Sequence, residues 1–461
     1  MNHDKNNPIN FDWYLSYPHS IEEESGAFGK SAKSYWLQNA HVPKCLINLD
    51  DCPQQTQEGL CLVNIKLSNG KIEQVIPASS MEEDAPYLDL QHKIVLPCFV
   101  DLHTHLDKGH IWERSPNLNG TFDLALNRSS ADAEQYWQPE DVYRRMEFGL
   151  KCSYAHGTKA IRTHIDSSGE QANISLGVFQ SLRSAWQDKI TLQAVSLVSL
   201  NYYQTPDGVA LADQIAEIGG VLGGVAFQNP ELDAQLDTVF ALAKERNLDL
   251  DFHADENGDR DSICLLKIAQ AAIRHRFSRQ ITCGHCCSLA VQSPKVVQET
   301  IELVKEANVG IVSLPMCNLY LQDRTAATTP HWRGVTRVKE LQQQGISVAF
   351  ASDNCRDPFF GFGDHDLLEV FEQAVKIAHL DTPYGDWIES VTKTPADLMG
   401  LDNVGTIKPG NSADLIIFSA RYFSELLSRS QHNRLVLRNG QQIQTNLPDY
   451  SELDDLIIQK Y

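Results

Sequence analysis

The chain has few basic side chains, because 39 Lys and Arg stand against 60 Asp and Glu in 461 residues, a formal net charge of −21. Such acidity opposes binding to nucleic acid or to anionic membranes. No apolar stretch approaches membrane-spanning length. The start of the chain has no basic segment followed by an apolar run, as a secretory signal would. These absences predict a cytoplasmic protein with no nucleic-acid or membrane partner.

The chain contains cysteine, but the spacing of its cysteines shows no disulfide framework. The eleven cysteines are odd in number and scattered, and we expect reduced, mostly buried thiols. Cys283 and Cys286 form a C-x-x-C motif in "CGHCC", yet a redox motif should open a helix in a thioredoxin-like unit, and a zinc knuckle needs a second ligand pair nearby. Neither context is found, so we expect both cysteines to act as small apolar residues and His285 to be the informative residue.

The chain has no internal repeat, and its pattern of polar and apolar residues divides it into four segments. Residues 1–34 are polar and irregular and predict an N-terminal arm, and short alternating strands in 35–96 predict the first part of a β-sandwich. In 97–400, eight apolar runs alternate with amphipathic segments, which predicts an α/β fold, a (β/α)₈ barrel. Strands return in 401–461, which we expect to form the second part of the sandwich and a C-terminal tail.

The main rival to the barrel is a doubly wound open sheet. It is disfavoured because no G-x-G-x-x-G opens a helix after any of the runs. In the strand-rich part before the barrel, Ser68-Asn69-Gly70-Lys71 predicts a tight hairpin, because Asn-Gly tolerates positive φ at both central positions.

Metal-type side chains fall repeatedly where the apolar runs end. These residues are His103 and His105 (first run), His164 and Asp166 (second), His253, Asp255 and Glu256 (fifth), His285 (sixth) and Asp353 (eighth). Barrel enzymes carry their catalytic groups at these strand ends, and H-x-H places both imidazoles on one face. A lone histidine such as His164 is more often structural, but four matched run ends together predict a metal site formed by His103, His105, His253 and Asp353.

Several stretches resemble a known superfamily. "LPCFVDLHTHLDK" is similar to the first-strand signature of the amidohydrolase superfamily, and "VGTIKPGNSADLIIF" to its C-terminal β-sandwich signature. The cytosine deaminase branch is resembled in both residues and motif order by three stretches: "HADENGD", "CGH" and "LQDRTAATTPHWRGVTRVKELQQQGISVAFASDNCRDPF". The resemblance runs from about residue 35 to 445.

The resemblance implies a role for each matching residue. His103, His105, His253 and Asp353 would bind one divalent metal, zinc or iron. Glu256 resembles the proton shuttle of the deaminases, and His285 the histidine that polarises the water. The fourth run, "VLGGVAFQ", carries no lysine to bridge a second metal, so a mononuclear site follows.

The residue types suit hydrolytic deamination of a ring amidine. A metal-bound water with Asp353 can supply hydroxide. Glu256 can protonate the ring nitrogen and then the leaving amine, because a carboxyl group both donates and accepts a proton. His285 can hydrogen-bond the attacking oxygen.

The chain also departs from the branch where the substrate would bind. Ser199 stands where the branch has a substrate-reading glutamine, with Gln204 as an alternative, and Phe359 replaces a tryptophan. Arg356, in the same loop as Phe359, could meet an acidic or carbonyl-rich substrate. The loop after the first run carries three weaker candidates for which a surface role is the default: Lys108, Trp112 and Asn119.

These observations predict a metal-dependent aminohydrolase of a cytosine-like or related small nitrogen heterocycle. The nearest alternative is another C–N hydrolase on the same scaffold, acting on a triazine N-alkylamine, which "SDNCRD" also resembles, or on a cyclic amide. A non-catalytic scaffold protein is disfavoured by the complete ligand set, and a disulfide reductase by the position of the C-x-x-C. A homo-oligomer is compatible with all of these.

Overall fold

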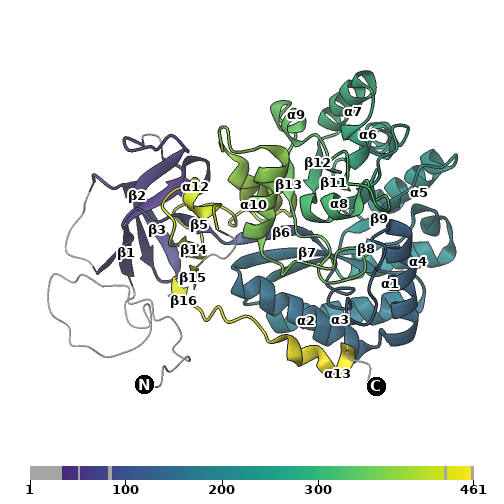
Figure 1. The fold of residues 1–461 in the computed structure, drawn as a ribbon, viewed down its shortest axis with the longest axis horizontal. Helices are drawn as coiled ribbons and strands as arrows, with labels where there is room; N and C mark the ends of the chain where they lie inside the picture. Colours follow the sequence, from purple (N-terminus) through teal and green to yellow (C-terminus); the bar gives the residue numbers. More distant parts are fainter. Residues whose placement is uncertain (1–33, 50–51, 81–85, 430–432, 458–461) are drawn as a thin grey trace. The chain divides into compact units, whose positions relative to one another are not determined.

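The computed structural model describes residues 34–49, 52–80, 86–429 and 433–457 (Figure 1). The predicted N-terminal arm therefore falls outside the described residues, apart from Ser34. The chain forms two compact units. One comprises Met1–Pro97 with Thr406–Ile443, and the other Cys98–Gly405 with Gln444–Tyr461.

The first unit contains two four-stranded sheets built from both halves of the chain. The sheet β3-β2-β1-β4 consists of β1 (Ser34–Pro43), β2 (Leu60–Ser68), β3 (Lys71–Pro77) and β4 (Tyr87–Asp89). The sheet β16-β15-β14-β5 consists of β5 (Val95–Pro97), β14 (Leu415–Phe418), β15 (Arg434–Arg438) and β16 (Gln441–Gln442). Two short helices, η1 (Lys44–Leu46) and α12 (Phe423–Leu426), accompany them. Apolar side chains of both sheets share one core, as expected of a sandwich.

The predicted hairpin is confirmed. Ser68 pairs with Lys71 across the turn between β2 and β3, and Asn69 and Gly70 both have positive φ, 49° and 79°. This is the left-handed backbone that Asn-Gly adopts at low cost.

The expectation of reduced thiols is wrong for one pair, because Cys52 and Cys61 form a disulfide. The segment before β2 folds back on it, with a bridge between Gln55 and Cys61, and so brings the two Cα atoms to 5.9 Å. That separation is normal for a disulfide. The other nine cysteines form no disulfide, and eight of them are buried.

The second unit is a closed barrel of eight parallel strands. They are β6 (Phe99–Thr104), β7 (Thr158–Asp166), β8 (Thr191–Leu197), β9 (Leu222–Ala226), β10 (Leu250–Ala254), β11 (Ile281–His285), β12 (Val309–Ser313) and β13 (Val348–Phe350). Bridges from Val195 to Val221 and from Thr104 to Asp353 join the three-stranded and five-stranded ladders into a ring. The barrel prediction is confirmed. The doubly wound open sheet is excluded, because these bridges leave no barrel strand with an unpaired edge.

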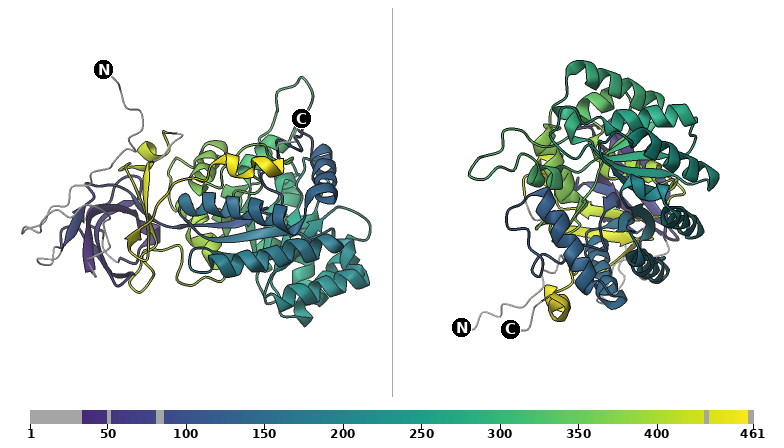
Figure 2. Two further views of the ribbon diagram at one scale, coloured as in Figure 1. Left: turned by 90° about the horizontal axis from the view of Figure 1, so that it is seen from below. Right: turned by 90° about the vertical axis from the view of Figure 1, so that its right-hand side faces the viewer.

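Helices lie outside this ring of strands (Figure 2, right). The longer ones are α1 (Phe122–Tyr136), α2 (Pro139–Ala155), α3 (Glu170–Trp186), α4 (Pro206–Glu217), α5 (Leu232–Glu245), α6 (Cys264–His275), α7 (Pro294–Glu306) and α10 (Leu367–Ala378). Shorter ones are α8 (Pro315–Leu321), α9 (Val338–Gln343), α11 (Lys393–Leu398), α13 (Asp454–Ile457), η2 (Leu200–Gln204), η3 (Cys287–Ala290), η4 (Trp387–Val391) and η5 (Tyr450–Leu453). Among the described residues, every helix is too short or too polar to span a bilayer.

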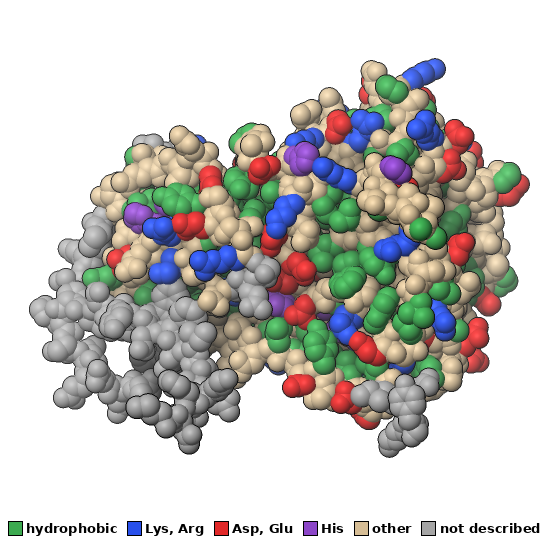
Figure 3. Space-filling model, viewed as in Figure 1, with side chains coloured by type: hydrophobic (Ala, Val, Ile, Leu, Met, Phe, Trp, Pro, Cys, Tyr) green, Lys and Arg blue, Asp and Glu red, His purple; other side chains and the backbone are tan. Residues whose placement is uncertain are grey.

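The face of the barrel unit drawn in Figure 3 carries side chains of both charges. Asp and Glu side chains are spread over the face in Figure 3, with Lys and Arg between them. Below the surface, the loop after β6 is fastened to α1 and α2 by Arg114, which donates to the carboxylates of Asp132 and Asp141. All three side chains are at least nine-tenths buried, so this network holds the loop beside the strand ends.

Candidate active site

Four predicted side chains meet at the carboxyl ends of the strands. His103 lies in β6 with His105 just after it, His253 lies in β10, and Asp353 follows β13. The backbone N–H of Asp353 donates to the carbonyl of His103 at 2.9 Å, and this bond joins the last strand to the first. The residue before it, Ser352, donates from its backbone N–H and its hydroxyl to the Asp101 carboxylate. We call His103, His105, His253 and Asp353 the strand cluster.

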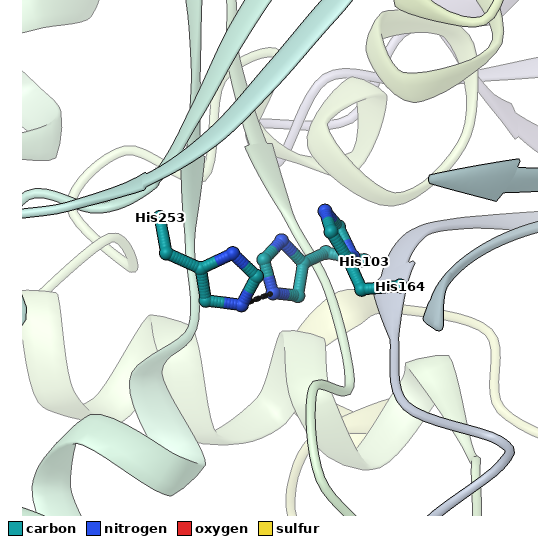
Figure 4. A group of neighbouring side chains, drawn as sticks. All are labelled: His103, His164 and His253. Carbon is teal, nitrogen blue, oxygen red and sulfur yellow. Dashed lines mark hydrogen bonds between the residues drawn. The ribbon is translucent and has the colours of Figure 1, made fainter. Parts of the chain in front are cut away.

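The strand cluster converges on one point. His253 Nε2 lies 3.1 Å from His103 Nε2 and 3.3 Å from His105 Nε2, and Asp353 Oδ1 lies 3.6 and 3.2 Å from the same two nitrogens. Figure 4 shows the rings of His103 and His253 with these nitrogens facing each other. Four ligands around a tetrahedral ion with bonds of 2.0–2.1 Å are separated by about 3.4 Å. The donor atoms therefore fit a single divalent cation.

The protonation states also suit a cation. Burial lowers the pKa of His103, His105 and His253 well below the usual range, and the neighbouring imidazole of His164 lowers it further. These imidazoles are neutral at physiological pH and offer lone pairs, the form in which histidine binds metals. Both Asp353 carboxylate oxygens are buried without a hydrogen-bond partner among the described residues, which leaves them open to an ion.

The sequence analysis treated His164 as a structural residue, but in the fold this residue of β7 lies next to the strand cluster. Its ring centroid is 3.9 Å from that of His103, and Figure 4 shows the two rings side by side. Its Nε2 lies 3.2 Å from Asp251, which also binds Arg162 at 2.9 Å. His164 thus links the strand cluster to a buried charged group inside the barrel.

A second polar group lies beside the strand cluster. His285 Nδ1 lies 3.0 Å from Asn318 Nδ2 and 3.3 Å from Glu256 Oε1. His285 Nε2 has no hydrogen-bond partner among the described residues. The His285 side chain forms a compact group with His103 and Asp353. With Asn318 donating to Nδ1, the Nε2 atom carries the proton and can donate it to an oxygen near the strand cluster.

Glu256 has the environment of a proton carrier. Burial raises the pKa of its carboxyl group well above the usual range, and the Asp353 charge adds to this effect. Its side chain keeps 16% of its surface exposed, so a bound molecule can reach it. Burial lowers the pKa of His285 to about 4, which leaves this imidazole neutral.

Two residues that hold this group were missed by the sequence analysis. Asn318 on α8 contacts both His285 and Glu256, and Gln322 donates to the backbone carbonyl of Glu256 at 3.1 Å. The available signal was "PMCNLYLQ" immediately after the seventh run, where a helix places residues 318 and 322 on one face. By contrast, Asp255 points away, because its carboxylate accepts the backbone N–H groups of Cys264 and Leu265 at the start of α6.

The predicted substrate contacts are spread over two loops. Ser199 directly precedes η2, which follows β8, and Gln204 is the last residue of η2; both are exposed. Phe359 is buried against Phe122 of α1. The Arg356 side chain forms an ion pair with Glu113 and lies over the Tyr450 ring, 4.9 Å from its centroid. The substrate roles of these four residues stay predictions.

The default surface role is wrong for Lys108. Only 5% of this residue is exposed, because its ammonium group donates to Asp166 at 2.8 Å and lies 5.4 Å from the centre of the Phe359 ring. Asn119 is exposed and accepts hydrogen bonds from Thr121 within its own turn, as the default expectation held. Trp112 is half-buried, close to Gly361.

Comparison with known proteins identifies relatives of the whole chain. The model of the "Amidohydrolase family" matches residues 148–444. A pterin deaminase of Rhizobium rhizogenes is 47% identical over 428 residues, covering 93% of this chain and 98% of that protein. An N-isopropylammelide isopropyl amidohydrolase of a Pseudomonas species is 25% identical, covering 80% and 90%. The crystal structure of 5-methylcytosine deaminase from Klebsiella pneumoniae with 5-fluorocytosine has a TM-score of 0.77 at 26% identity, covering 89% and 97%.

Proposed function

The chain belongs to the amidohydrolase family and is a hydrolase that deaminates a nitrogen heterocycle, and we propose that this heterocycle is a pterin. A pterin is a 2-amino-4-oxopteridine, whose amino group sits on a cyclic amidine carbon. Hydrolysis would replace that amino group by an oxygen, release ammonia and leave both rings intact. The observation that carries the proposal is the 47% identity to a pterin deaminase over almost the full length of both chains.

Proteins of this family use a divalent metal, and we propose His103, His105, His253 and Asp353 as its ligands, with zinc or iron as the ion. The separations of 3.1–3.6 Å between the donor atoms support this assignment. A divalent ion bound there lowers the pKa of water toward neutrality and so makes hydroxide available. Among the described residues, β9 presents no lysine for a second ion at this site.

We propose that three side chains move or hold protons. Asp353 accepts a proton from the attacking water. Glu256 holds a proton, as its raised pKa allows, and donates it to the ring nitrogen next to the amidine carbon. The Glu256 carboxylate then takes up the proton held by Asp353 and donates it to the departing amine, and it regains a proton from the hydroxyl group as the C=O bond forms. His285 donates from Nε2 to the attacking oxygen, while Asn318 fixes its ring through Nδ1.

The departures from the cytosine deaminase pattern favour a larger ring. Serine is shorter than glutamine, so Ser199 leaves room at the end of β8 where a one-ring substrate would be gripped. We propose that the second ring of a pteridine extends toward Ser199 and Gln204, and that Phe359 contributes an apolar wall. We also propose a cytoplasmic location, as the sequence predicts.

The test is ammonia release by zinc- or iron-loaded protein on pterin, cytosine and N-isopropylammelide under identical conditions. The proposal expects kcat/KM to be largest for pterin, with the 2,4-dioxopteridine as product. Preference for cytosine would assign a pyrimidine pocket and overturn the pterin assignment. Release of isopropylamine from N-isopropylammelide as the preferred reaction would favour the alternative of amine removal from a triazine, which the 25% identical relative supports.

A further inference from the structure

A second group of metal-type side chains lies apart from the strand cluster. His110 in the loop after β6, Cys355 in the loop after β13 and His365 just before α10 each offer one ligand atom, and these three atoms lie within 4.8 Å of one another. No more than 2% of any of the three residues is exposed. We call these three residues the loop cluster.

The imidazoles of the loop cluster are buried without partners. All four ring nitrogens of His110 and His365 lack a hydrogen bond within the described part of the chain. Burying an unpaired polar nitrogen is unfavourable, because the nitrogen loses its hydrogen bonds to water, and this group contains four. A neutral imidazole donates from one nitrogen and accepts at the other, so each ring needs two partners. Such a concentration of unmet bonding capacity beside a thiol points to a ligand.

Local backbone features bring the three side chains together. A Cβ at Gly149 of α2 would meet His365 Nε2 at 3.0 Å and Leu106 at 2.9 Å, so the absence of a side chain there makes room for the ring. His110 and His365 both have positive φ, 62° and 55°, a backbone that bulky residues rarely adopt. The backbone N–H of His110 also donates to the carbonyl of Cys355 at 3.1 Å, so the two loops are in contact.

The charges nearby are balanced. Arg356 and Arg145 lie close to His110, but Arg356 is paired with Glu113 and Arg145 with Asp141. The Asp364 carboxylate acts on both Cys355 and His365. A cation between the three ligands would therefore meet no uncompensated positive charge.

We propose that His110, Cys355 and His365 form a second, structural zinc site that joins the loop after β6 to the loop after β13. Two imidazoles and one thiolate suit the borderline-soft Zn²⁺ ion. Three protein ligands leave the fourth position to water. The Cys355 thiol would lose its proton to solvent as the cation binds, because the thiolate is the form that coordinates a metal.

The position of the site indicates its purpose. Cys355 lies two residues after Asp353, and His110 lies two residues after Lys108, which reaches Phe359 and Asp166. A cation bound to both loops would hold these residues in place without touching a substrate. The site is independent of the proposed substrate, because none of its ligands belongs to the strand cluster.

Cobalt substitution tests the site without measuring activity. Co²⁺ bound to a thiolate gives a near-ultraviolet charge-transfer band, whereas a site of histidines and a carboxylate gives none. The full chain loaded with Co²⁺ should show this band, and elemental analysis of zinc-loaded protein should find two ions per chain. Cys355→Ser and His365→Gln should each reduce the count to one, and Cys355→Ser should abolish the band.

Two further variants make the result specific. Cys152→Ser removes another buried thiol on α2 and should keep both the band and two ions. His103→Ala should lose the ion of the strand cluster and keep the band. One ion per chain with no thiolate band in the wild-type protein would overturn the proposal and assign water to the imidazoles. A band that survives Cys355→Ser, or disappears with Cys152→Ser alone, would overturn it equally.

Discussion

The strand cluster and the loop cluster contain similar side chains but differ in what holds them. Each residue of the strand cluster lies within a barrel strand or up to three residues after its end, and its donor atoms are separated by 3.1–3.6 Å. The residues of the loop cluster come entirely from connecting segments. Paired strands fix side chains closely, whereas loops need a further bond to reach the same precision. The first cluster suits catalysis, and the second suits a structural ion.

The largest effect is expected from His103→Ala, which separates the two clusters most sharply. Loss of one of four donors should remove the ion of the strand cluster, and ammonia release should fall by more than about 10³-fold because hydroxide is no longer supplied. Metal content and turnover on pterin measure this directly. A variant that keeps both would show that His103 does not bind the catalytic ion.

Glu256→Gln should have the next largest effect while leaving both clusters intact. An amide cannot carry a proton, so kcat should fall by about 10²–10⁴-fold with unchanged metal content. Glu299→Gln on the exposed face of α7 is the matched control and should behave as the wild type. Turnover of Glu256→Gln at the control rate would rule out this carboxyl group as the proton carrier.

His285→Ala should reduce kcat by about 10²–10³-fold, because one donor to the attacking oxygen is lost. The ion of the strand cluster should remain, since His285 is not one of its four proposed ligands. Steady-state kinetics beside elemental analysis separate the two effects. Parallel loss of metal and activity would instead place His285 among the ligands.

A smaller effect is expected from Asn318→Ala, because this residue acts on the reaction through His285. Removing the 3.0 Å contact frees the His285 ring to rotate, and kcat should fall about 10-fold. KM should change little, since Asn318 is assigned no substrate contact. A change confined to KM would assign Asn318 to substrate binding rather than to positioning.

The smallest effects are expected from Cys283→Ala and Cys286→Ala. Both thiols are buried in or next to β11 and serve neither cluster. Each variant should keep most of the activity and lose about 1 kcal/mol of unfolding free energy, the cost of a small cavity. Activity and the denaturation midpoint measure the two quantities. A loss of activity as large as that of His285→Ala would return the C-x-x-C to the reaction.

The barrel and the strand cluster could be predicted because their signals are local and repeated. Eight apolar runs correspond to β6–β13, and an imidazole or a carboxylate at the end of a run lies at a known end of a barrel strand. Asn318 could not be recognised in this way, because an asparagine on a short helix has no distinctive pattern. Lys108 was expected at the surface, since a lysine in a loop is usually solvated and nothing local indicated its pairing with Asp166.

The sequence by itself determined the fold class, the order of the strands and the residue types available for chemistry at their ends. Periodicity and strand-end position are properties of neighbouring residues, so they can be found without knowing what lies across the barrel. Only the tertiary structure decided that Cys52 meets Cys61, that Asn318 supports His285 and that His110, Cys355 and His365 share one buried space. These residues are joined by loops whose paths depend on packing throughout the unit, and no local pattern records which loops meet.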